Sequence, residues 1–185
     1  MKVFTKKVFT VFLAVLIVIG STLLSVNLKL SKDFDKVTNG FYNGNLINGS
    51  KEKSLHSLLL IVAEESSNLA SIAERNGLDV SEFKNKADYF IHDVITMQDD
   101  ISYIYYCYQD LLEDLMEVGQ ALTGLTLNAN DEAAAVVSLQ SIMDAQASID
   151  ASGYNESVRQ CIASLQFPTE IFADLAGVDL PEYFA

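Results

Sequence analysis

Apolar side chains recur along this chain at helical spacing, and one uninterrupted apolar stretch stands near its start. Residues Val8 to Leu28 hold no charged side chain over 21 positions, close to the roughly 20 residues that a membrane-spanning helix needs. A cleaved signal peptide has the same basic start but a shorter apolar core and a small-residue exit site. The segment Ser21 to Ser25 is a poor exit site, and no cysteine follows that would mark a lipoprotein. We therefore expect an uncleaved membrane anchor over residues 1–30, with a cleaved signal as the alternative.

A segment rich in glycine and asparagine separates this run from the rest of the chain. Residues 37–50 hold glycines at positions 40, 44 and 49 and asparagines at positions 39, 43, 45 and 48. This composition is typical of a loop. We predict a linker over residues 31–50, after which a helical domain begins.

Residues 51–76 show the periodicity of an amphipathic helix. Its apolar face consists of Leu55, Leu58, Val62, Leu69, Ile72 and Ala73. Gly77 follows at the position where glycine commonly ends a helix.

A longer periodic run comes next. Asp79 and Glu82 have the spacing of a capping box, which predicts a helix start. Positions that alternate in steps of four and three are then all apolar or tyrosine: Phe83, Ala87, Phe90, Val94, Met97, Ile101, Ile104, Tyr108, Leu111, Leu115, Val118 and Leu122. A sustained 3.5-residue repeat is typical of a bundle or coiled-coil seam. We expect one helix of roughly 60 Å at 1.5 Å per residue.

The last third of the chain predicts another helix and a short returning segment. Residues 131–166 contain no proline, and their apolar side chains lie mostly three or four positions apart, which predicts a helix. The residue before a proline is disfavoured in helical conformation, so this helix should end at Phe167-Pro168. A short helix capped at Gly177 should follow, and the aromatic end, Tyr183-Phe184, should dock on the bundle.

These elements predict an all-α fold in three parts. Residues 1–30 form the N-terminal transmembrane helix, residues 31–50 the linker, and residues 51–185 an antiparallel bundle of long helices.

The chain beyond residue 30 is strongly acidic, with 8 basic and 25 acidic residues and a net charge of −17. Such a surface repels nucleic acid and anionic lipid headgroups, so neither is expected as a partner. Its simplest role is solubility and repulsion between copies; a basic partner is the alternative. Equal numbers of lysines flank the apolar run, which gives the positive-inside rule little bias. The acidity favours a bundle outside the cytoplasm.

Candidate chemistry is sparse. Cys107 and Cys161 are the only cysteines, and His56 and His92 are isolated, so neither a zinc site nor a Ser/Cys–His–acid grouping is predicted. We expect no cofactor and no enzymatic activity. The cysteines lie in apolar helical runs, which favours buried free thiols; a disulfide is the alternative.

Two further clusters have a structural and a functional interpretation. The carboxylates Asp110, Glu113, Asp114 and Glu117 share one helix face and could bind a cation or a basic peptide. The Glu-x-x-His pairs of bundle metal sites are missing, so a solvated face is the better prediction. Four tyrosines surround Cys107: Tyr103, Tyr105, Tyr106 and Tyr108. Tyr108 belongs to the seam, and helix packing by the others is favoured over glycan or peptide stacking.

The C-terminal third resembles the LemA family. The residues that carry the resemblance are Tyr154, Asn155, Val158 and Arg159, then Phe167, Pro168, Ala173, Gly177 and Phe184. The resemblance is strongest over residues 126–185, as for a divergent member. It implies a small, membrane-anchored bacterial helical bundle without an established reaction, with these motif residues in structural roles. Arg159, a lone cation, is expected to pair with Glu156 or Asp150.

The resulting expectation is a single-pass membrane protein whose bundle lies outside the cytoplasm. Its role would be interaction or scaffolding at the cell envelope with a protein partner, as the LemA resemblance implies. The alternative is an exported binding module for a peptide, a glycan or a cation.

Overall fold

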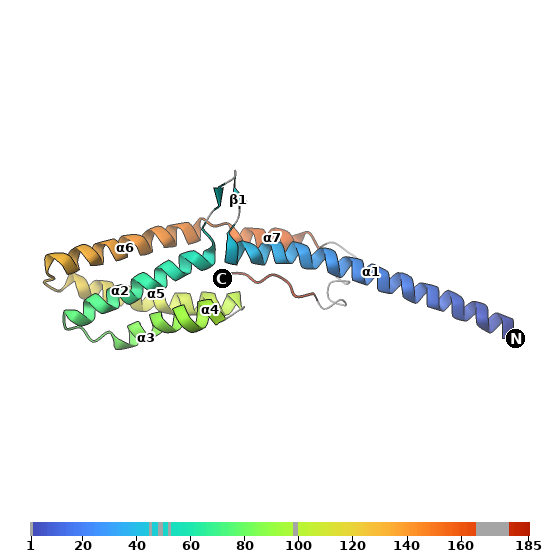
Figure 1. Ribbon diagram of the computed structural model, residues 1–185, viewed down its shortest axis with the longest axis horizontal. Coiled ribbons are helices and arrows are strands. Elements are labelled where there is room, and N and C mark those ends of the chain that lie inside the picture. Colours follow the sequence, from blue (N-terminus) through green and yellow to red (C-terminus); the bar gives the residue numbers. More distant parts are fainter. Residues whose placement is uncertain (1, 45, 48–49, 52, 98–99, 166–177) are drawn as a thin grey trace. The chain divides into compact units, whose positions relative to one another are not determined.

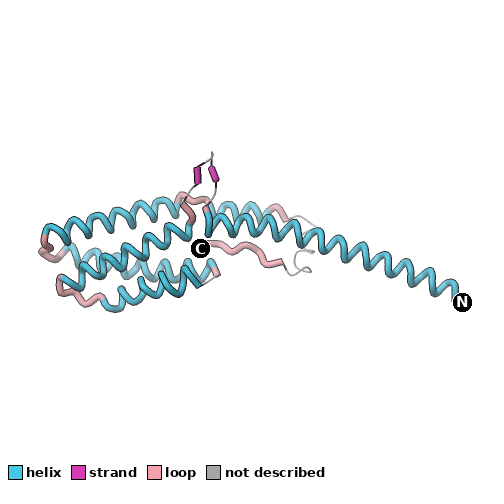
Figure 2. Tube along the Cα trace, viewed as in Figure 1, coloured by secondary structure: helices cyan, strands magenta, loops and turns pink. Residues whose placement is uncertain are grey.

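The computed structural model describes residues 2–44, 46–47, 50–51, 53–97, 100–165 and 178–185. The described residues are overwhelmingly helical, which confirms the all-α prediction. Among them, the strands are limited to β1 (Leu46–Ile47) and β2 (Ser50–Lys51), a two-residue antiparallel pair (Figure 2).

The chain forms two compact units. One, here called the anchor unit, comprises residues 1–38 and 157–181; the other, the bundle unit, comprises residues 39–156 and 182–185.

The anchor unit is built on helix α1 (Lys2–Asn43). Its apolar stretch is exposed, with Val11, Ile17 and Val18 each 62–63% accessible. Further along, Leu30 and Phe34 are buried in a small core with half-buried Val26, Cys161, Leu165 and Val178 packed against them. The described part of the unit thus has an exposed apolar stretch followed by a packed region.

Helix α1 continues to Asn43, so residues 31–43 of the predicted linker, including the glycine- and asparagine-rich residues 37–43, are helical. Glycine and asparagine lower helix propensity, but tertiary packing routinely overrides that preference. Phe41 is fully buried in the bundle unit and supplies such packing. The helix ends where Gly44 adopts a positive φ of 72°.

Helix α2 (Leu55–Arg75) agrees with the prediction for residues 51–76. All six residues of the predicted apolar face are buried. The Ser54 side chain accepts a hydrogen bond from the Ser57 N–H at the N-terminus. At the C-terminus, the Leu78 N–H donates to the Ala73 carbonyl at 3.0 Å and Gly77 has φ of 87°, as predicted for its capping role.

The prediction of a single long helix after Asp79 is wrong. The structure instead has α3 (Ser81–Tyr89), a π-helical turn η1 (Phe90–Val94), α4 (Ile95–Met97) and α5 (Ile101–Thr123). The Lys86 ammonium lies 3.1 Å from the Asp110 carboxylate and 2.8 Å from that of Asp114. In one continuous helix, positions 86 and 114 would be about 42 Å apart. Helices α3 and α5 therefore lie side by side.

The seam itself is correct, because every seam residue whose side chain the structure describes is buried; the Met97 side chain lies outside that set. The π-helical turn η1 lies between α3 and α4, and the Thr96 hydroxyl donates to the Ile91 carbonyl there at 2.7 Å. The capping box did not form. Val80 occupies the N-cap of α3, and the Asp79 carboxylate accepts from the Ser81 hydroxyl instead.

The helix expected over residues 131–166 is divided into α6 (Ala129–Asp150) and α7 (Tyr154–Ala163). The chain turns between them, where Gly153 has a φ of 64°. This left-handed conformation is easily adopted by glycine. The predicted helix end at Phe167-Pro168 and the predicted short helix capped at Gly177 fall outside the described residues.

Helix α2 is the centre of the bundle unit, packing against α3, α5 and α6 (Figure 1). At its C-terminal end, Arg75 forms an ion pair with Asp131 of α6 at 2.7 Å. Farther back, the Ser138 hydroxyl donates to the Glu65 carboxylate at 2.7 Å. Arg75 and the Asn76 side chain lower the pKa of Asp131, since both hydrogen bonds favour its charged form.

Candidate functional site

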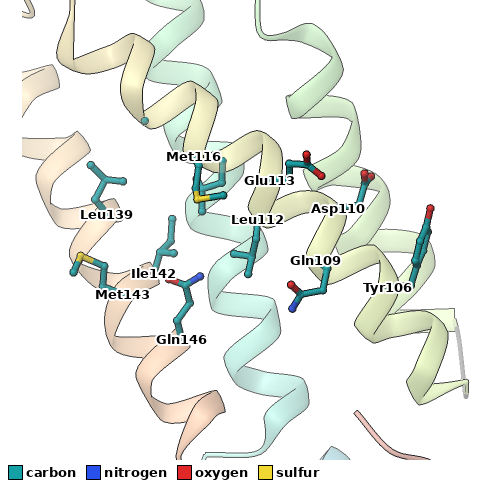
Figure 3. Close-up of a pocket in the computed structure, with 12 residues that line it drawn as sticks. Tyr106, Gln109, Asp110, Leu112, Glu113, Met116, Leu139, Ile142, Met143 and Gln146 are labelled. Atoms are coloured by element: carbon teal, nitrogen blue, oxygen red, sulfur yellow. The ribbon is translucent and has the colours of Figure 1, made fainter. Parts of the chain in front are cut away.

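A groove of about 730 Å³ in the bundle unit is lined by α5 and α6. Its lining consists of Tyr106, Gln109, Asp110, Leu112, Glu113, Leu115, Met116 and Gly119 of α5 with Leu139, Ile142, Met143 and Gln146 of α6. Figure 3 shows Leu112 of α5 and Ile142 and Gln146 of α6 pointing into the gap between the two helices.

Packing explains why this groove stays open. Helices α5 and α6 each pack on α2, and the groove lining includes one glycine and two flexible methionine side chains. Gly119 would have open space around an added Cβ. Met116 and Met143, which both line the groove, are 64% and 62% exposed. Methionine adapts readily to irregular surfaces and is common where partners bind.

A second hollow of about 430 Å³ extends the groove. It shares Gly119 and Leu139 with the first and is also lined by Leu122, Val136 and residues of the connection between α5 and α6. The two hollows together form one surface along the paired faces of α5 and α6, which we call the α5–α6 groove.

The charges that line the α5–α6 groove are all negative: Asp110, Glu113 and Glu132. Glu113 is exposed, whereas Asp110 also contacts Lys86. Hydrogen bonds from the Lys86 ammonium to Asp114 and Asp110 raise the pKa of Lys86, which therefore stays charged. The predicted solvated acidic face is thus exposed at Glu113 and Glu117, while Asp114 is half-buried against Lys86.

Part of the predicted LemA-like motif forms a second arrangement, at the C-terminus. The Asn155 side-chain amide donates to the Phe184 carbonyl at 2.7 Å, and its oxygen accepts from the Phe184 N–H at 2.8 Å. The Tyr154 hydroxyl donates to the Glu182 carbonyl at 2.9 Å. One side chain thereby satisfies both backbone groups of Phe184, as a neighbouring strand would.

The Phe184 ring completes this arrangement, which we call the C-terminal clasp. It lies 5.0 Å from the Tyr105 ring and 5.8 Å from each of the Tyr108 and Phe41 rings, within the range of favourable aromatic contacts. The predicted docking is therefore confirmed for Phe184, which is 7% exposed, while Tyr183 is 38% exposed. Burial raises the pKa of Tyr108 to about 12 and also raises the pKa of Tyr154.

Glu182 attaches the clasp to a helix terminus. Its carboxylate accepts from the Ile101 N–H at 2.7 Å and from the Ser102 N–H at 3.3 Å. These are the first amides of α5, which have no partner within their own helix. A carboxylate is favoured there by the helix dipole as well.

The remaining motif residues lie in different environments. Val158 is fully buried on α7, and Arg159 is exposed on the same helix. Phe167, Pro168, Ala173 and Gly177 fall outside the described residues.

The tyrosines near Cys107 divide between packing and exposure. Tyr105 is half-buried and Tyr108 buried, while Tyr103 and Tyr106 are 37% and 68% exposed. The Tyr103 and Tyr89 hydroxyls lie 3.3 Å apart. Cys107 and Cys161 are both free and half-buried, and burial raises the pKa of each thiol. Such thiols are weak nucleophiles at neutral pH.

Within the part of the chain that the structure describes, no group of three or more His, Cys, Asp and Glu side chains could hold a metal ion. His56 lies beside Tyr42 and within 3.1 Å of the Ile95 carbonyl, a packing contact between α2 and α4.

Sequence reasoning missed both the groove and two members of the clasp. In the sequence, the groove was indicated only by apolar residues that lie off the buried stripes: Met116 of α5, and Val136 and Met143 of α6. Phe41 lies within a segment that was predicted to be a loop. Glu182 belongs to no periodic pattern or motif in the sequence. Comparison with protein families, with characterised proteins and with solved structures found no match to this chain.

Proposed function

We propose that this protein is a membrane-anchored interaction or scaffolding protein of the bacterial cell envelope, with its bundle unit outside the cytoplasm. The observation that carries the proposal is the exposed apolar stretch of α1. One described helix segment, Leu13–Asn43, is long and apolar enough to cross a membrane.

The exposure of that stretch supports an anchor over a core helix. All residues from Leu13 to Ile19 are exposed, on every side of the helix, and the large apolar ones among them are 47–63% accessible. A helix that is apolar all round is stable when it is buried in a large core or in lipid. The packed region of the anchor unit begins only near Val26 and Leu30, which leaves lipid as the environment for the preceding turns.

The acidity of the chain supports the orientation. Beyond residue 30 the net charge is −17, and anionic lipid at the cytoplasmic face would repel such a domain.

The α5–α6 groove supports the interaction role. It is open and lined by flexible apolar side chains, while catalysis needs converging polar groups held at reacting distance. The proposal therefore includes no reaction.

A second candidate is an exported module that binds a peptide, a glycan or a cation. It is favoured by a hollow of about 330 Å³ beside the clasp, where Tyr105, Tyr108 and Tyr154 line the wall with Asp150 and Glu156. Aromatic rings with nearby carboxylates are suited to sugars or basic peptides. Binding of glycans and short peptides to the intact protein is compared with their binding to the Tyr105→Ala variant. Binding that the substitution weakens would favour this candidate over the first.

The anchor is tested by extraction of native membranes at high pH and high salt. The intact protein should remain in the membrane fraction, and the form without residues 2–28 should be soluble with the same helical content. Release of the intact protein by salt alone would overturn the anchor.

The interaction role is tested by a photo-crosslinking residue placed at Met143 in living cells. Specific adducts are expected there and not at Val137, which is 63% exposed on the same helix but lines a different hollow. Equal labelling, or none at either position, would contradict the role of the groove.

A further inference from the structure

We infer that the α5–α6 groove binds a basic amphipathic helix of a partner protein, an inference that rests on the proposed interaction role. The partner helix would place apolar side chains on the groove and lysine or arginine along its rims. Four properties of the groove lead to this occupant: its length, its apolar spacing, its charge and its flexible lining.

The length matches a helix of ordinary size. Groove-lining residues of α5 extend from Tyr106 to Leu122, which is about 25 Å at 1.5 Å per residue. A partner of between four and five turns would fill it. Helices bind such surfaces through apolar residues spaced three and four positions apart.

The apolar residues of the two walls have that spacing. Those that are not buried are Leu112, Met116 and Gly119 on α5, and Val136, Leu139 and Met143 on α6. On both helices the steps are of three and four residues, so each wall presents one continuous stripe. Each stripe borders the buried face of its helix, where Leu111, Leu115, Ile142 and Ala145 lie. Leu115 and Ile142 also line the groove.

Charge selects the partner. The charged lining residues Asp110, Glu113 and Glu132 are all acidic. A second copy of this chain would bring carboxylates against carboxylates, since Arg159 is the only basic residue after position 87. Like charges facing each other across an interface cost affinity, and opposite charges add affinity and speed association. A basic helix is the occupant with complementary charge.

The methionines suit a helix whose exact side chains vary. Met116 and Met143 are flexible and about two-thirds exposed, so they can repack against different apolar partners. Binding should therefore depend on the amphipathic pattern and the charge of the helix more than on one particular side chain.

The test uses the full chain in nanodiscs of uncharged lipid, where basic peptides have no anionic bilayer to bind. The probe is a fluorescent 18-residue peptide of leucine and lysine, with leucines at positions i, i+3, i+4 and i+7. Two controls have the same length: one carries glutamate in place of lysine, and one has the same composition in scrambled order. Fluorescence anisotropy measures each affinity.

The basic amphipathic peptide should bind at least tenfold more tightly than either control, and more weakly as salt rises, because salt screens the rim charges. Met143→Lys should weaken binding by tenfold or more, while Val137→Lys, which adds the same charge on the same helix outside the groove, should weaken it by less than threefold. Glu113→Gln should weaken binding, and Glu117→Gln, outside the groove lining, should weaken it less.

Three results would overturn the inference. Equal loss with Met143→Lys and Val137→Lys would indicate non-specific attraction to the acidic surface. Equal binding of the glutamate peptide would remove the charge argument. Self-association of the protein without peptide, abolished by Met143→Lys, would identify a second copy as the occupant. If any of these results were obtained while crosslinks at Met143 still formed in cells, the proposed interaction role would stand. If those crosslinks were also absent, that role would be contradicted.

Discussion

Asn155 pairs with Phe184 through two hydrogen bonds, one to each backbone group, at 2.7 and 2.8 Å. The pair joins the start of α7 to the penultimate residue of the chain. It explains why an asparagine follows a buried tyrosine in this motif: a carboxamide carries both a donor and an acceptor on one short side chain. The described C-terminus is thereby part of the bundle unit's core.

The clasp should contribute to stability. Phe184→Ala should lower the unfolding free energy by about 3 kcal/mol, because it removes a buried ring from its aromatic contacts. Asn155→Ala should lower it by about 1–3 kcal/mol by leaving two backbone groups without their partner. Urea denaturation followed by circular dichroism measures both. Tyr183→Ala is the control and should change little, since Tyr183 is 38% exposed; unchanged melting of Phe184→Ala would mean that the tail is a free arm.

The hairpin of α3 and α5 predicts energetic coupling between Lys86 and Asp114. Lys86→Glu should destabilise the protein, because it places a third carboxylate beside Asp110 and Asp114. Adding Asp114→Lys should recover part of that loss. A double-mutant cycle should give a coupling of about 0.5–1 kcal/mol, as for partly exposed ion pairs, and the coupling should fall with added salt. Strict additivity would support one continuous helix, with these positions far apart.

The buried tyrosines of the clasp predict a loss of stability in alkali. Burial raises the pKa of Tyr108 to about 12, whereas an unfolded tyrosine has a pKa near 10. Folding therefore favours the neutral form: the stabilisation is fully present below pH 10 and is lost as the pH rises toward 12. The unfolding free energy should fall over that window, and Tyr108→Phe should make the fall shallower. The same slope in both proteins would mean that Tyr108 does not titrate in this way.

The sequence predicted which residues are buried better than it predicted where each helix begins and ends. The seam from Phe83 to Leu122 was correct, but the step of four from Met97 to Ile101 keeps the same register although α4 and α5 are separate helices. No glycine or proline lies between Met97 and Ile101, and Asp100, the N-cap of α5, resembles any polar residue on a helix surface. Gly153 was visible as a single glycine, yet one glycine is tolerated within many helices.

The candidate site was largely beyond the reach of the sequence. Periodicity identifies the face that a helix buries, but a groove depends on which helices pack together. The exposed Met116 and Met143 become neighbours of one groove only because α5 and α6 both pack on α2. Tyr154, Asn155 and Phe184 were singled out in advance by the LemA resemblance, although the hydrogen bonds that join Asn155 to Phe184 were not foreseen.

Membrane topology tests the account most directly. A protein with an epitope tag before Lys2 is expressed, and protease is added to intact spheroplasts. We expect loss of the bundle unit and survival of a tagged fragment of about 40 to 50 residues, because a bilayer protects roughly 20 helical residues and the segment before them. Complete protection of the full-length protein would place the bundle in the cytoplasm, and a mature N-terminus near Ser25 would show that the apolar stretch is a cleaved signal; either result would contradict the account.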